Sequence, residues 1–182
     1  MEIETLFGLP AHPLIVHVPI VLVPLSAVGA VLMCWPFLRA KIGWATVVIA
    51  GIATVFTFLA VGSGEALEET VERTTTNKAL LETHTEMGEN LRPWILLLFL
   101  VLLGIMLFDH VRARAAAGGG EAKLSPQRAR TIGVILSVLS IVFAALSTYW
   151  VVKIGHSGAK ASWEKTSKQM ERSGGQADDG DD

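Results

Sequence analysis

Four long apolar runs dominate the hydropathy pattern of the chain, and none of them contains Asp, Glu, Lys or Arg. They cover residues 13–38, 42–64, 93–108 and 131–152. A helix of about 20 residues crosses the roughly 30 Å hydrocarbon core of a bilayer. The pattern therefore predicts an all-α protein, an integral membrane four-helix transmembrane bundle. We place its spans at about 13–38, 42–64, 93–111 and 131–153.

Basic residues are distributed unevenly between the segments that join these spans. The loop 65–92 has seven glutamates and three basic residues, whereas the two short connections are mainly basic. The basic residues of those connections are Arg39, Lys41, Arg112, Arg114, Lys123, Arg128 and Arg130. Because cytoplasmic loops carry an excess of Lys and Arg, the short connections are predicted to be cytoplasmic. Both termini are then outside.

The polar segments add little beyond this topology. We assign residues 1–172 to the four-helix transmembrane domain and residues 173–182 to a disordered acidic tail, because that tail is too polar to form a core. The chain is 51% hydrophobic and carries a net charge of only -2, which argues against nucleic acid binding. The single cysteine, Cys34, excludes a disulfide framework and cysteine-based metal clusters.

Histidines provide the candidate chemistry. Four of the five, His12, His17, His84 and His156, fall on the predicted outer side, and only His110 is cytoplasmic. His17 lies inside the first span, where an ionisable side chain without a partner is costly and indicates a functional site. Pro19 and Pro24 each remove a backbone donor and predict a bend in the helix near this ring.

Two further segments bring polar side chains to the same side. His84 opens a stripe at helical spacing, which continues through Met87, Leu91, Ile95 and Leu98 into the third span. Glu65 follows two glycines at the membrane boundary, where a carboxylate can bind a metal or accept an imidazole N–H. His156 lies in Gly155-His156-Ser157-Gly158. These glycines can end the fourth helix, so the sequence does not decide which way the His156 side chain points.

The cofactor hypotheses use these outer residues. A bis-histidine haem b would take His17 and His84 as ligands, with His156 as a substitute. A divalent metal would be bound by ligands from the set His12, His17, Glu65 and His84. The third alternative is a structural or accessory subunit without cofactor, whose histidines hydrogen-bond backbone groups freed by the prolines.

Several segments resemble a known family of bacterial four-helix membrane proteins, catalogued as domain of unknown function 2231. The similar segments are the opening Leu9–Pro19, the run Gly62–Glu69, the segment around His84, and Gly155–Lys160 with Trp163. The resemblance covers about residues 8–163 and implies a four-helix fold in the bacterial inner membrane. It implies no established activity. Some members resemble fusions to redox domains such as Rieske-type centres, which favours electron transfer over hydrolysis.

The function predicted from the sequence is therefore a multi-pass membrane protein in contact with the lipid bilayer. It is a haem-b-binding or electron-transfer subunit with a redox partner protein, or alternatively a divalent-metal-binding or accessory subunit. An enzymatic role has the least support, because the sequence contains no phosphate-binding loop and no HExxH spacing.

Overall fold

The computed structural model describes residues 5–6, 8–72, 78–117 and 125–175 of the chain. It begins with a small antiparallel hairpin of β1 (Thr5–Leu6) and β2 (Leu9–Pro10). Gly8 lies in the turn with a φ of 79°, a value that favours glycine. Five helices follow: α1 (Ala11–Ile15), α2 (His17–Leu32), α3 (Pro36–Glu72), α4 (Lys78–Ala117) and α5 (Pro126–Gly175).

The predicted membrane spans are confirmed as helices. Among the residues that the structure describes, four helical segments are long and apolar enough to cross a membrane: Ala11–Leu32, Pro36–Ala66, Glu82–Ala117 and Pro126–Lys160. The first ends at Leu32, earlier than the sequence indicated, and a turn leads to Pro36 at the start of α3. Proline suits a first helical position because its missing N–H would have no partner there.

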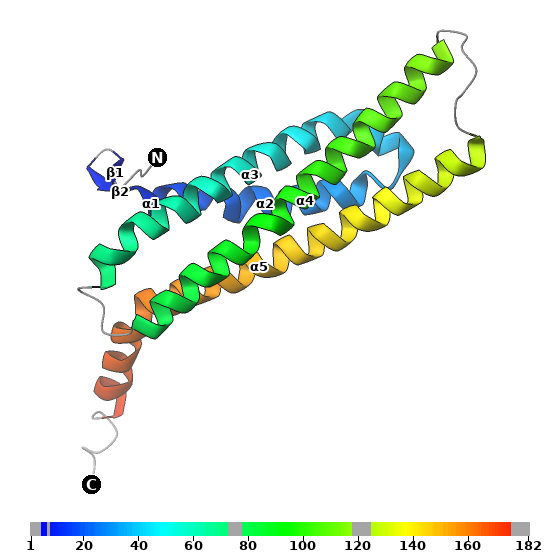
Figure 1. Cartoon of the computed structure of the whole chain (residues 1–182). Helices are drawn as coiled ribbons and strands as arrows, with labels where there is room; N and C mark the ends of the chain where they lie inside the picture. The colour runs from blue at the N-terminus through cyan, green and yellow to red at the C-terminus, as the bar shows by residue number, and fades with distance from the viewer. Residues whose placement is uncertain (1–4, 7, 73–77, 118–124, 176–182) are drawn as a thin grey trace.

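The helices form a four-sided bundle in which neighbours run in opposite directions (Figure 1). α2 packs against α3 and α5, and α4 also packs against α3 and α5. The short α1 packs against α3. We call the end of the bundle that holds α1 the α1 end. It also holds the last part of α3, the first part of α4 and the last described part of α5 (Figure 1).

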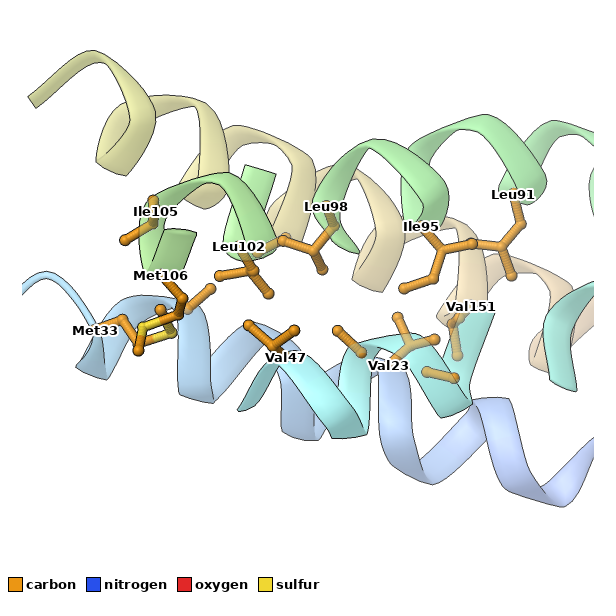
Figure 2. Close-up of a cluster of buried hydrophobic side chains, with 14 residues drawn as sticks. Val23, Met33, Val47, Leu91, Ile95, Leu98, Leu102, Ile105, Met106 and Val151 are labelled. Atoms are coloured by element: carbon orange, nitrogen blue, oxygen red, sulfur yellow. The ribbon is translucent and has the colours of Figure 1, made fainter. Parts of the chain in front are cut away.

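The core follows one face of α4. Met87, Leu91, Ile95 and Leu98 are all buried, which confirms the stripe predicted from His84 onward. Leu102 and Ile105 continue it toward the other end, where Met33, the residue after α2, and Met106 of α4 belong to the same buried cluster (Figure 2). Lipid tails are as apolar as these side chains, so the helices associate chiefly through close packing. Small buried residues allow that approach, among them Ser26, Ala30, Ala50, Ala53, Ser140 and Ala144.

Several buried hydroxyl groups in the spans are hydrogen-bonded to the backbone, whereas the buried hydroxyl oxygens of Ser147 and Thr148 have no hydrogen-bond partner within the described residues. Ser26 donates to the carbonyl of Leu22 and Thr57 to that of Ala53, each at 2.7 Å. Thr54 donates to Ala50 of its own helix at 2.8 Å and also lies 3.4 Å from the Ile95 carbonyl of α4. Since no water reaches this depth, each such bond avoids the cost of an unpaired polar group.

Two boundaries near the chain's end differ from the sequence-based assignment. α5 continues through Gly155 and Gly158 without a break, so these glycines do not end the helix. It extends to Gly175, three residues into the segment assigned to a tail, and residues 176–182 lie outside the described chain.

Close approach of α2 to α3 depends on Gly29. A Cβ at this position would lie 2.5 Å from Cγ2 of Thr46, a buried side chain that cannot move away freely. We expect Gly29→Ala to lower the free energy of unfolding by about 1–3 kcal/mol, as overpacking of a core does. Thermal unfolding of the purified protein in detergent measures the effect. Gly104→Ala is the matched control because nothing lies within 4 Å of its Cβ position. Equal stability of the two variants would contradict this account of the packing.

Candidate functional site

Two histidine rings meet at the α1 end of the bundle. The rings of His12, from α1, and His84, from α4, have centroids 6.3 Å apart and an interplanar angle of 86°. Both residues are half-buried. The rings therefore form an edge-to-face pair between two segments that are far apart in sequence.

His12 is anchored to the backbone of α3. Its Nδ1 lies 2.8 Å from the carbonyl oxygen of Ala60, which also accepts a hydrogen bond from the Ser63 hydroxyl at 2.9 Å. A carbonyl can only accept, so Nδ1 of His12 carries the proton. Gly64 lies beside the ring, and a Cβ at that position would be 3.1 Å from Nδ1 and Cε1. The ring thus lies directly on the backbone of α3.

His84 is anchored to α5 in a similar way. Its Nδ1 lies 2.8 Å from the Ser157 hydroxyl, and that hydroxyl donates its proton to the carbonyl of Ile154, also at 2.8 Å. Because a hydroxyl has only one proton, Nδ1 of His84 must be the donor in the first bond. Gly158 lies against the same ring, with its Cβ position 3.1 Å from Cε1.

The two hydrogen bonds fix the same neutral tautomer in both rings. With the proton on Nδ1, the lone pair of each neutral ring is on Nε2. Imidazoles that bind a metal usually donate their other ring N–H to a carbonyl or a similar acceptor. An activated serine nucleophile donates its hydroxyl proton to a histidine, whereas here His84 donates to the Ser157 hydroxyl. The geometry therefore suits metal ligation.

The other predicted ligands lie elsewhere. His17 is exposed, and its Nδ1 is 2.5 Å from the Pro13 carbonyl, one turn earlier in the chain. Glu65 is exposed and accepts a hydrogen bond from the Arg92 guanidinium at 2.7 Å. His156 is exposed on α5, one residue from the buried Ser157. The ring beside His84 is thus that of His12.

Helical phase explains why His12 and His17 cannot both face the bundle. Five residues correspond to a rotation of about 140° around a helix axis, so their side chains point to different sides. Ala11 and Ile15 are buried against Ala60 of α3, and this contact turns the neighbouring His12 toward α3. His17 is then left on the outside.

Four residues of the site were missed from the sequence: Ser63, Gly64, Ser157 and Gly158. Both serine–glycine pairs lie in segments that carry the family resemblance, Gly62–Glu69 and Gly155–Lys160, and this was the available signal. Within the described residues, no three His, Cys, Asp or Glu side chains come close enough to hold a metal ion together. The predicted metal-ligand set is therefore not gathered at one point.

An apolar hollow on the bundle surface lies apart from these rings. Its lining comes from the middle of α3 and from α4: Val47, Val48, Gly51, Ile52, Val55, Phe56 and Phe99. None of these side chains can ligate, titrate or donate a hydrogen bond, so the hollow offers only apolar contact.

The anchoring bonds predict the tautomers directly. Nitrogen-15 NMR of the histidine-labelled protein in detergent should show the Nδ1–H form for His12 and His84 at neutral pH. Ser157→Ala should change the ring signals of His84 and leave those of His12 in place. Ser140→Ala is the control, because the Ser140 hydroxyl bonds only within α5, to Ser137. An Nε2–H form of His84 in the wild-type protein would contradict the assignment.

Comparison with known proteins gives one match. A family model described as "Predicted membrane protein (DUF2231)" matches residues 8–169, which include both rings and the serines and glycines around them. No curated protein and no solved structure matches the chain significantly.

Proposed function

The chain belongs to the DUF2231 family of predicted membrane proteins, and from this premise we propose that it is a haem-b-binding, electron-transfer subunit in which His12 and His84 would hold the haem. The observation that supports the proposal is the pair of rings at 6.3 Å, each anchored through Nδ1. His12 takes the place of His17 in the pair that was favoured from the sequence.

The number of protein ligands favours haem over a bare metal ion. Haem iron already has four porphyrin nitrogens and needs only axial ligands from the protein. A divalent transition metal takes four or more ligands, and structural zinc sites use four from the protein. The described part of the chain offers two imidazoles and no third ligand beside them. Two histidines are a complete set for haem and an incomplete one for zinc.

The separation of the rings is of the size that a metal shared by two imidazole nitrogens would need. Imidazole nitrogens bind first-row metals at about 2.0–2.1 Å, which places the centres of two opposed rings about 6 Å apart. The observed centroid separation is 6.3 Å. Gly64 and Gly158 have no side chain, and each ring packs directly against a helix backbone at one of these positions.

Haem, when bound, supplies one-electron chemistry, and the residues of the chain supply binding and orientation. The Ala60 carbonyl and the Ser157 hydroxyl each accept the Nδ1 proton of a ring and so hold its Nε2 in one direction. Such acceptors also raise the basicity of the ligand. The position of the pair at the α1 end places it near the surface where a redox partner protein docks in this proposal.

Absorption spectroscopy of the purified protein tests the haem proposal. From haem-replete cells it should show a Soret band, with an α band that sharpens on reduction. His12→Ala and His84→Ala should each abolish these bands, because each removes one axial nitrogen. His110→Ala and His17→Ala are the controls and should retain the bands.

Other outcomes decide between the alternatives. A folded, colourless protein that binds no added haem would refute the proposal. Metal analysis would then be decisive: stoichiometric zinc or copper that is lost in His12→Ala indicates a divalent-metal site, and its absence leaves the accessory role. Loss of the haem bands in His17→Ala and in His84→Ala, with the bands retained in His12→Ala, would restore the pair favoured from the sequence.

We further propose that the membrane is the bacterial inner membrane and that the α1 end faces outward. The support is the distribution of basic residues, since Arg39, Arg112, Arg128 and Arg130 all lie at the other end of the bundle. In this orientation both termini are outside the cytoplasm. The histidine pair then faces the same side as the termini.

Cysteine labelling tests this orientation. In a Cys34→Ala background, an impermeant maleimide added to intact spheroplasts should label Glu86→Cys and not Ala117→Cys, since the two positions lie at opposite ends of α4. Both original residues are exposed, and Ala117→Cys should be labelled once the cells are lysed. The reverse pattern would invert the topology.

A further inference from the structure

We infer that Gly64 and Gly158 are positioning residues for the two imidazoles, and that they set the separation of the rings from opposite sides. For haem affinity this inference rests on the proposed function, but the ring positions themselves can be tested without haem. The observation is that each glycine is the point where a ring lies directly on a helix backbone.

The glycines of α5 differ in what surrounds them. Glycine is unfavourable in a helix interior, so Gly155 and Gly158 in an unbroken helix require a reason. A Cβ at Gly158 would lie 3.1 Å from Cε1 of His84, whereas nothing lies within 4 Å of the Cβ position at Gly155. The His84 ring therefore explains why glycine occupies position 158 but does not explain Gly155. Gly155 can serve as a control position on the same helix.

The glycines of α3 show the same contrast. A Cβ at Gly64 would lie 3.1 Å from both Nδ1 and Cε1 of His12, and the Cβ position at Gly62 is open within 4 Å. The Gly64 contact involves the same ring edge that bonds to the Ala60 carbonyl. A methyl group there would press on the ring exactly where its hydrogen bond forms, so the bond would lengthen as the ring moved.

The contacts with the two glycines affect the distance between the rings, because the two rings are also in contact with each other. His12 has α3 behind it and His84 has α5 behind it, with centroids 6.3 Å apart. At 3.1 Å a new methyl group is too close by a few tenths of an ångström, and the ring must move away from its helix. Metal ligation depends on ring orientation, so loss of an outer contact typically lowers metal affinity by about 10–100-fold.

Four alanine variants test the inference in the full-length protein. Gly64→Ala and Gly158→Ala should weaken haem binding by about 10–100-fold in a haem titration of the haem-free protein. Gly62→Ala and Gly155→Ala should bind haem as the wild-type protein does. Neither Gly62→Ala nor Gly155→Ala should melt earlier than wild type without haem, because alanine favours a helix and nothing lies within 4 Å of either Cβ position.

A second measurement does not depend on haem. In nitrogen-15 spectra of the haem-free protein, Gly64→Ala should shift the ring signals of His12, and Gly158→Ala those of His84. Gly62→Ala and Gly155→Ala should shift neither. Unchanged ring signals in Gly64→Ala and Gly158→Ala would overturn the inference, whether or not haem binds. Shifted signals in a protein that never binds haem would support the positioning role and refute the proposed function.

Discussion

The structure depends on one constraint, which is that a polar group inside a bilayer costs free energy unless it has a hydrogen-bond partner within the protein. Helices satisfy the backbone, and the buried hydroxyls of Ser26, Thr54 and Thr57 bond to carbonyls of the preceding turn. The histidines follow the same rule with acceptors on other helices. His12 uses a carbonyl of α3, and His84 uses a hydroxyl of α5. Satisfying the polar rings therefore also ties the helices together at the α1 end.

Much of the fold could be predicted because a membrane imposes long apolar runs and a fixed helical period. The four spans and the buried stripe from Met87 to Leu98 on α4 were predicted and confirmed. The boundaries were harder to place. Residues 33–38 are as apolar as the helix before them, so hydropathy alone could not show the turn that leads to Pro36. Similarly, glycines near His156 suggested a helix end, yet packing against α4 keeps α5 helical there.

The sequence predicted that the candidate site contains histidines and at which end of the bundle they lie. It did not predict which two histidines lie side by side. The partner of His84 depends on which side of α1 is turned toward the bundle. Burial of Ala11 and Ile15 against α3 determines that side. A helix of five residues is too short for its own pattern to reveal this face. The roles of Ser157 and Gly158 depend on which side of α5 is turned toward the bundle. If α5 were rotated by one residue, His156 would point inward instead.

The anchoring of His84 on α5 has a consequence for biosynthesis. The chain is made from its N-terminus, so α5 leaves the ribosome after α1 and α4. Until α5 has been inserted and has packed against α4, His84 lacks the Ser157 hydroxyl that orients it. A nascent or truncated chain can thus contain both histidines and still lack the organised pair. Assembly of the site is in this way coupled to the synthesis and insertion of α5.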